Sequence, residues 1–206
     1  MKRLFLLLTI LSFSAYVADA QWRKVEKLKK DKQPNIKIAY QGRTPEPGYR
    51  IGAEFILKKK KVTYGKFTRI NERFLSANLM YAYNADLYNI FTLHPEYTTR
   101  TTHAKSGIFA DLNFGFGGGG TFNNDQAPVY ILNPDGSESI KPIKRYFIMA
   151  SIGAGLGYDF NYRLKKPIKL YYRLGLSPVY FEAFPYQALP RHELGIITNL
   201  SWLKKN

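Results

Sequence analysis

The chain has 206 residues, of which 31 are Lys or Arg and 15 are Asp or Glu, giving a formal net charge of +16. Its length suggests one domain, and a hydrophobic content of 45% is enough for either a core or a lipid-facing belt. The absence of cysteine excludes disulfides, thiolate metal sites and a lipoprotein anchor.

The N-terminus has the three parts of a secretory signal peptide. Lys2 and Arg3 precede an apolar run, and Ala18-Asp19-Ala20 supplies small residues for cleavage after Ala20. The alternative is a membrane-anchoring helix, which needs about 20 apolar residues, and polar residues interrupt this run. We therefore expect export of the mature chain, which argues against a nucleic-acid partner.

Strict alternation of apolar with small or polar residues recurs along the rest of the chain. In the stretch SIGAGLGYDF, residues 151–160, every second residue is apolar and most of the others are glycine, serine or aspartate. Such alternation is typical of a strand with one apolar face. Eight segments are candidate strands: residues 35–41, 49–58, 74–83, 88–99, 106–117, 151–160, 167–180 and 191–203. Six of them alternate clearly, whereas residues 88–99 alternate less well and residues 35–41 are short.

Together these segments predict an all-β fold, an antiparallel transmembrane β-barrel with eight strands. Segments of about ten alternating residues separated by turns are the signature of an outer-membrane barrel. A bilayer cannot satisfy free backbone N–H and C=O groups, so the sheet must close on itself. We therefore expect three parts: residues 1–20 as signal peptide, 21–34 as a basic periplasmic tail and 35–206 as the outer-membrane barrel.

One hairpin illustrates how both faces would be used. If Asp159 and Lys169 pair across a turn centred on Leu164, Gly157 pairs with Tyr171 and Gly155 with Arg173. Each glycine then leaves room for a large inward neighbour, and an acid meets a base. A two-residue slip would keep the same faces, so the pattern leaves this alternative register open.

An even number of strands leaves both chain ends in the periplasm. Counting back from the C-terminus then puts the long segment 118–144 outside the cell and the tight turn 161–166 on the periplasmic side. Short periplasmic turns and long external loops are the expected asymmetry. The segment 58–73 would be an unusually long inner connection.

Four stretches carry a resemblance to a known group of proteins: IFADLNFGFGGGGTF, RYFIMASIGAGLGYDF, KPIKLYYRLGLSP and FPYQALPRHELGI. They resemble a functionally uncharacterised family of small outer-membrane barrels from Bacteroidota-type Gram-negative bacteria. The resemblance covers about half of the chain, from Gly107 to Leu200. It implies a fold and an outer-membrane location, and no catalytic residues.

Two features that could suggest chemistry lack the necessary context. Residues 115–120 match GxGxxG, but a Pro-containing loop follows in place of the helix that a dinucleotide site requires. The three histidines have no helical metal spacing, and His192 and Glu193 are predicted on opposite faces, so no catalytic triad is indicated. We expect no enzyme activity, no cofactor and no metal.

The candidate site is the set of charged and polar residues on the predicted inner face. A narrow eight-stranded lumen has room for side chains and little else, so a paired polar plug is favoured over an ion path or ligand site. The predicted interior network comprises Arg50, Glu54, Asp111, Asn113, Asp159, Lys169, Arg173 and Glu193.

The sequence therefore predicts an integral outer-membrane protein that acts as a structural or interaction subunit, with minor transport as a further expectation. Its expected partners are outer-membrane lipid and other outer-membrane or periplasmic proteins. Two alternatives stay open: a soluble periplasmic lipid-binding barrel with its apolar face inward, and a lipid-modifying outer-membrane enzyme.

Overall fold

The computed structural model describes residues 23–30, 33–42, 47–83, 88–123, 130–140, 145–181 and 187–199. The predicted signal peptide and residues 200–206, including the end of the last predicted strand, lie outside the described residues. Within these ranges the architecture is all-β, with a single turn of helix, α2 (Asn161–Leu164).

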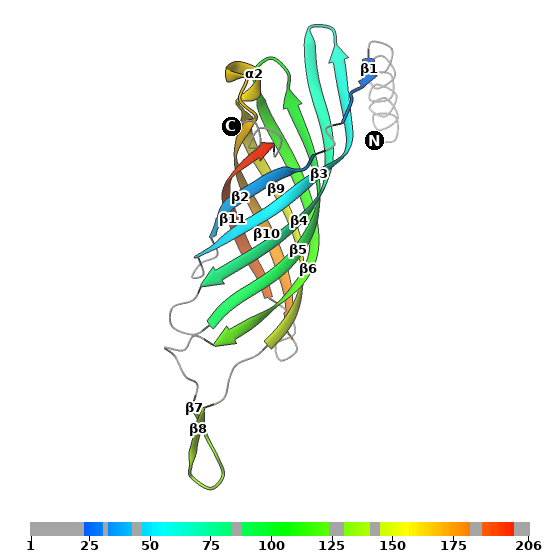
Figure 1. The fold of residues 1–206 in the computed structure, drawn as a ribbon. Coiled ribbons are helices and arrows are strands. Elements are labelled where there is room, and N and C mark those ends of the chain that lie inside the picture. Colours follow the sequence, from blue (N-terminus) through cyan, green and yellow to red (C-terminus); the bar gives the residue numbers. More distant parts are fainter. Residues whose placement is uncertain are drawn as a thin grey trace, which may run out of the picture.

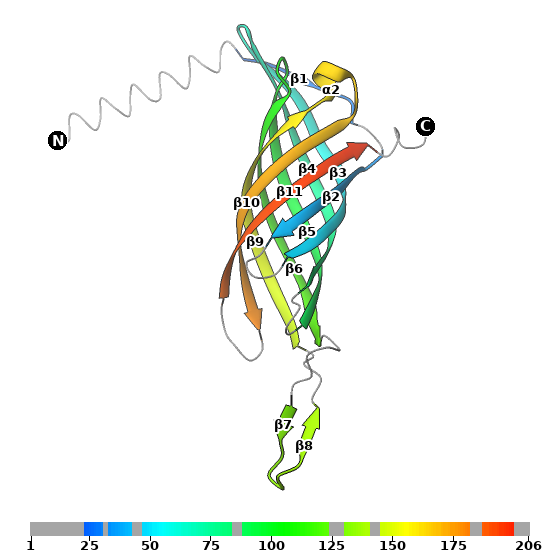
Figure 2. The same cartoon turned by 90° about the vertical axis from the view of Figure 1, so that its left-hand side faces the viewer.

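Eight antiparallel strands close into a ring, as the alternation predicts (Figures 1 and 2). The last strand pairs with the first over eight residue pairs, which completes the closure. The strands are β2 (Asn35–Gly42), β3 (Pro47–Tyr64), β4 (Phe67–Tyr83), β5 (Tyr88–His103), β6 (Ile108–Asn123), β9 (Arg145–Asp159), β10 (Ile168–Phe181) and β11 (Gln187–Asn199).

The two ends of the barrel differ. A small hairpin of β7 (Tyr130–Leu132) and β8 (Glu138–Ile140) projects from one end, and α2 lies at the other (Figure 1). We call these the β7–β8 end and the α2 end. The predicted long segment 118–144 thus contains the last residues of β6 and this hairpin, while the predicted tight turn contains α2.

The alternation of side chains produces an apolar outside and a polar inside. On β9, Ile152 and Leu156 are 50% and 67% exposed, whereas Ser151, which directly precedes Ile152, is buried. The same arrangement holds on β10, where Leu174 is exposed and Arg173 is buried. Large apolar residues therefore cover the outer wall of the ring, which is the pattern a lipid-facing barrel requires.

Of the two registers that the alternation left open for the β9–β10 hairpin, the structure has the one without the two-residue slip. Asp159 pairs with Lys169, Gly157 with Tyr171 and Gly155 with Arg173. An ideal Cβ built on Gly155 would lie 2.5 Å from Cγ of Arg173 and 2.6 Å from Oδ1 of Asp111. Glycine is required here because the inward side chains of the neighbouring strands occupy its side-chain space.

The segment 58–73 is not the long connection that the sequence suggested. It forms a β3–β4 hairpin that extends beyond the ring at the α2 end, with Gly65 in its turn at a φ of 52°. A bulge between Ile56 and Lys58 changes the register at the point where the extension begins. The alternation did not predict this extension, because the bulge interrupts the period-two pattern.

The predicted basic tail is also partly regular. Residues Arg23–Lys27 form β1, which pairs antiparallel with the extended part of β3, from Lys60 to Tyr64. This pairing covers an edge of β3 that would otherwise present free backbone groups. None of the helical segments in the described ranges is long and apolar enough to cross a membrane.

Candidate functional site

The eight residues of the predicted interior network divide into two groups along the lumen. Six of them lie in the middle of the ring and are at most 3% exposed: Arg50, Glu54, Asp111, Asn113, Arg173 and Glu193. Asp159 and Lys169 lie nearer the α2 end, where Asp159 is 5% exposed and the side chain of Lys169 is 15% exposed.

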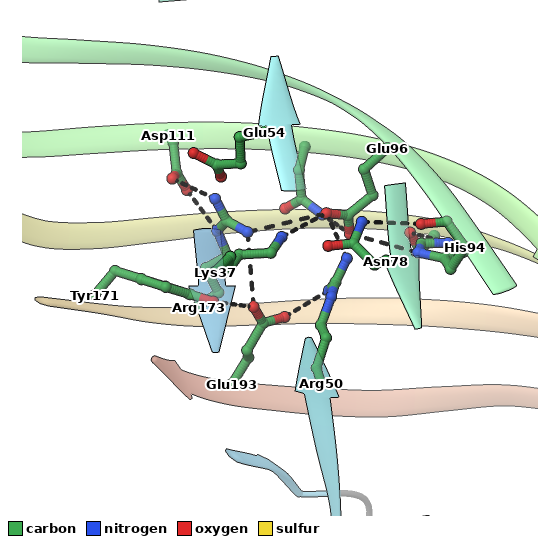
Figure 3. Close-up of polar contacts among 12 residues, drawn as sticks. Lys37, Arg50, Glu54, Asn78, His94, Glu96, Asp111, Tyr171, Arg173 and Glu193 are labelled. Atoms are coloured by element: carbon green, nitrogen blue, oxygen red, sulfur yellow. Dashed lines mark hydrogen bonds and ion pairs between the residues drawn. The ribbon is translucent and has the colours of Figure 1, made fainter. Parts of the chain in front are cut away.

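The best-formed ion pair of the central group joins β10 to β6, across the intervening strand β9. Arg173 donates from Nε to Oδ1 of Asp111 at 3.0 Å and from Nη2 to Oδ2 at 2.7 Å (Figure 3). This two-pronged geometry is the strong form of a charge-assisted hydrogen bond. The guanidinium also lies over the ring of Tyr171, 4.6 Å from its centroid. Arg173 is thus held on two sides.

Glu193 on β11 links Arg50 and Tyr171 (Figure 3). Nη1 of Arg50 donates to Oε2 of Glu193 at 2.6 Å, and the hydroxyl of Tyr171 donates to Oε1. Nη1 of Arg173 lies 3.7 Å from the same carboxylate. Both oxygens of this buried carboxylate therefore have partners, as a buried charge requires.

The centre of the network is Glu96 on β5, which the sequence reasoning missed. Its Oε2 lies 2.5 Å from Nη2 of Arg50 and 3.3 Å from Nζ of Lys37. Its Oε1 accepts a hydrogen bond from Nδ2 of Asn113 at 2.9 Å and lies 3.6 Å from Nη2 of Arg191. Glu96 thus connects residues from β2, β3, β6 and β11.

The signal for Glu96 was present but weak. Its strand alternates regularly in the structure, with His94, Glu96 and Thr98 buried and Leu93 exposed. On the outward side, however, Pro95 and Thr99 interrupt the run of large apolar and aromatic residues. The apolar half of the pattern therefore fades within residues 88–99, and the inner face was not assigned.

A fourth carboxylate, Glu54, pairs with Arg100 on β5. Nη2 of Arg100 lies 3.4 Å from Oε1 of Glu54 and 3.3 Å from Oδ2 of Asp111. The rings of Phe74 and Phe109 contact the guanidinium, with centroids 4.7 Å and 4.8 Å from its central carbon. These aromatic contacts favour the cation at a site away from water.

A smaller ion cluster lies at the α2 end of the lumen. Glu72 lies between Lys59 at 3.1 Å and Lys169 at 3.6 Å, and Lys169 also lies 3.3 Å from Asp159. These residues line a cavity of about 100 Å³. The predicted Asp159–Lys169 contact is therefore present, but it belongs to this terminal cluster and not to the central network.

Apolar side chains separate and cover the polar groups. Tyr171 and Phe109 pack with Ala39 and Ile197 between the central network and the α2-end cluster. A second group closes the lumen toward the β7–β8 end; it consists of Ile90, Phe147, Met149 and Val179. The central charges are consequently shielded from water on both sides.

Ser151, His94 and Glu96 form a row that superficially resembles a nucleophile, base and acid. The hydroxyl of Ser151 lies 3.1 Å from Nε2 of His94, and Nδ1 of His94 lies 3.6 Å from Glu96. All three are buried, and Glu96 is already engaged by four cations. A nucleophile needs access to substrate, so this geometry is that of a buried polar contact.

The other candidates for chemistry are not brought together. His192 lies exposed on the outer wall and Glu193 is buried in the lumen, so the two point to opposite faces as predicted. Ser177 is buried, and Ser201 lies outside the described residues. Among the described residues, no group of three or more metal-binding side chains could hold an ion.

The sequence matches no protein-family model and no curated protein sequence. Its fold is similar to the N-terminal β-barrel domain of OprF from Pseudomonas aeruginosa, with a TM-score of 0.50 and 14% identity over 84% of this chain and 100% of that chain. Neisserial surface protein A also matches, with a TM-score of 0.38 and 11% identity over 82% and 95% of the two chains. At such identity the likeness to OprF concerns the fold alone. The chain has the fold of a small outer-membrane barrel.

Proposed function

We propose that this protein is an integral barrel of the outer membrane of a Gram-negative bacterium, with a plugged polar interior, and that it acts as a structural or interaction subunit. The observation that carries the proposal is the inversion of polarity. Isoleucine, leucine and aromatic side chains are exposed around the ring, while arginine, glutamate and aspartate are buried inside it. In water this arrangement would be unstable, whereas in a bilayer it satisfies both faces.

In this proposal the α2 end faces the periplasm and the β7–β8 end faces the outside. The tight α2 turn and the projecting β7–β8 hairpin support this orientation, because periplasmic turns are short and external loops long. Residues 1–20 would then be the export signal. Membership of the Bacteroidota-type family rests on the four sequence stretches that resemble it.

The alternative of a soluble lipid carrier needs an apolar lumen and a polar outer wall. The burial pattern is the reverse, since Lys37, Arg50 and Glu96 are buried inside and Leu174 and Ile196 are exposed outside. The structural role is therefore favoured over the carrier.

The proposal also assigns no catalysis to the lumen. Hydrolysis of a lipid ester would require a substrate to reach Ser151, and this residue lies beneath Phe147 and Met149 on its own strand. If a purified sample hydrolyses a lipid ester and Ser151→Ala abolishes that activity, the structural assignment is wrong.

Fractionation of a Gram-negative host that expresses the full chain tests the location. We expect the protein in the outer-membrane fraction, resistant to an alkaline wash and released only by detergent. Recovery of folded protein in the soluble periplasmic fraction, without detergent, would contradict the proposal.

A further inference from the structure

The outer wall carries a groove where β5, β6, β9 and β10 lie side by side. Its volume is about 580 Å³, within the range of about 300–1,000 Å³ that is typical of small-molecule sites. The floor is formed by outward-facing Thr101, Ala110 and Ala154, which are small, and the larger Tyr172 and Leu174 line it as well. Between the larger outward side chains of Leu112 and Leu156, these small residues leave a depression.

A cluster of cations lies beside this groove on the extended part of the β3–β4 hairpin. Lys58 is directly opposite Arg73, and Lys60 is directly opposite Lys27 of β1. Within the described ranges no ion pair involves any of these four side chains. Like charges placed directly opposite one another destabilise a sheet. An anion bound between these side chains would reduce their electrostatic repulsion and so stabilise the hairpin.

The groove and the cations form one continuous surface. Arg73 is opposite Thr99 on β5, Thr99 is opposite Leu112 on β6, and Leu112 is opposite Ala154 on β9. Thr99 and Thr101 also line a second depression of about 230 Å³ together with Lys58, Lys60 and Arg73. A molecule with an anionic head and an apolar chain could therefore contact both parts at once.

We propose that this surface binds one anionic glycerophospholipid, with its phosphate beside Lys58, Lys60 and Arg73 and an acyl chain in the groove over Ala110 and Ala154. The proposal rests on the proposed function, because it requires the outer wall to face a bilayer. The cations lie at the α2 end, so the lipid belongs to the periplasmic leaflet in the orientation proposed above. Basic clusters at a membrane boundary bind anionic headgroups.

A second copy of the chain is a poorer occupant of the same surface. Its outer wall is apolar and could fill the groove, but the described carboxylates of its eight ring strands are buried in the lumen. Within the described part of the ring, the outer wall therefore has no carboxylate to place beside the cations. A phosphate supplies both the charge and the small size that the cluster needs.

Native mass spectrometry of the full mature chain, released from vesicles that contain equal amounts of phosphatidylglycerol and phosphatidylethanolamine, tests the proposal. We expect one retained phosphatidylglycerol per barrel. The triple variant Lys58→Gln, Lys60→Gln, Arg73→Gln should lower its retention on the order of 100-fold, because each cation near an anionic surface contributes about fivefold. The matched control is Arg163→Gln, Lys165→Asn, Lys166→Gln, which removes three exposed cations at the same end and should leave retention unchanged.

The groove is tested separately by filling it. Ala154→Phe should weaken retention of phosphatidylglycerol by about tenfold, since it displaces chain contacts worth about two methylenes. Ala77→Phe adds the same ring to an exposed position on β4 and should have no effect.

Three results would overturn the lipid site. The first is equal retention of the two lipids by the wild type, and the second is unchanged retention of phosphatidylglycerol in both site variants. The third is a wild-type dimer that Ala154→Phe dissociates, because this result would assign the groove to a second copy. Each of these leaves the proposed function intact if the barrel inserts into vesicles. Failure of the wild type to insert into vesicles of either lipid would instead contradict the proposed function.

Discussion

Glu96 on β5 and Arg191 on β11 lie on opposite sides of the eight-stranded ring, yet Nη2 of the arginine is 3.6 Å from Oε1 of the glutamate. Side chains from the two walls therefore meet in the middle of the lumen. Among the described residues, these side chains fill the lumen at this level, because Arg50 and Lys37 approach the same carboxylate from other strands.

This closure predicts that the wild-type barrel passes no steady single-channel current in planar bilayers. Ions would have to displace paired charges and the apolar group around Phe147 and Met149. The measurement is the conductance of purified, refolded protein at neutral pH. A large and steady conductance from the wild type would show that the charges line a pore.

Arg173→Ala should lower the free energy of unfolding by about 3–5 kcal/mol, the usual cost of removing one partner of a buried pair. The variant leaves Asp111 without its two hydrogen bonds from Arg173, and only the longer contact with Arg100 at 3.3 Å remains. Urea titration of the protein folded in lipid vesicles gives the value. Arg163→Ala, at an exposed position in α2, is the control and should change the stability little; equal effects of both variants would contradict the role of Arg173.

Glu96→Gln should destabilise the barrel much more than Glu26→Gln. The first change leaves several buried cations without their shared carboxylate, whereas Glu26 forms an exposed pair with Lys61 at 3.8 Å. Exposed pairs contribute about 0–1 kcal/mol. The same urea titration compares the two, and similar losses would show that Glu96 is not the centre of the network.

Leu174→Arg and Tyr180→Arg test which side chains face lipid. Both residues are exposed on the outer face of β10, Leu174 in the middle of the strand and Tyr180 near its β7–β8 end. An arginine at the bilayer midplane costs about 2–4 kcal/mol and near the interface about 0–1 kcal/mol. We expect lower folding yields in vesicles for Leu174→Arg, and equal yields would refute the assignment of the outer face.

Gly155→Ala should cost about 1–3 kcal/mol, the usual penalty of overpacking. Its Cβ would meet Cγ of Arg173 at 2.5 Å and displace the pair with Asp111. Gly118→Ala is the control, since its nearest contact is the carbonyl oxygen of Phe147 at 3.1 Å and requires a smaller shift. Thermal unfolding in the same detergent separates the two, and a harmless Gly155→Ala would mean that the lumen is loosely packed.

Local patterns predicted the ring and the faces of the strands, and they narrowed one register to two alternatives. The β9–β10 register was accessible because its turn is short and both faces agree in the same pairing, glycine against arginine inside and alanine against leucine outside. Residues 35–41 are a weak candidate on account of their length, and they form all but the last residue of the strand β2.

Contacts across the lumen could not be predicted in the same way. Which residue of β5 meets which residue of β11 depends on the stagger of all the strands between them, and alternation does not specify that stagger. The partners of Glu54, Glu96 and Arg191 therefore became visible only in three dimensions. The β3–β4 extension was missed for a different reason: the bulge between Ile56 and Lys58 shifts the alternation, and the four lysines that follow it, Lys58–Lys61, show no alternation of polarity.

The way the ring closes has a consequence for how the protein is assembled. The pair that closes it, β2 with β11, brings Lys37 and Glu193 from the two ends of the barrel sequence to the same side of the lumen. Before closure the cations and carboxylates that meet across the lumen are far apart. Moving any of them into the hydrocarbon core as an unpaired ion would then cost free energy. A half-built sheet therefore has to keep its inner face in water while its outer face enters the lipid. We expect dehydration of the interior and joining of the first and last strands to be one kinetic event, the slow and final step of insertion.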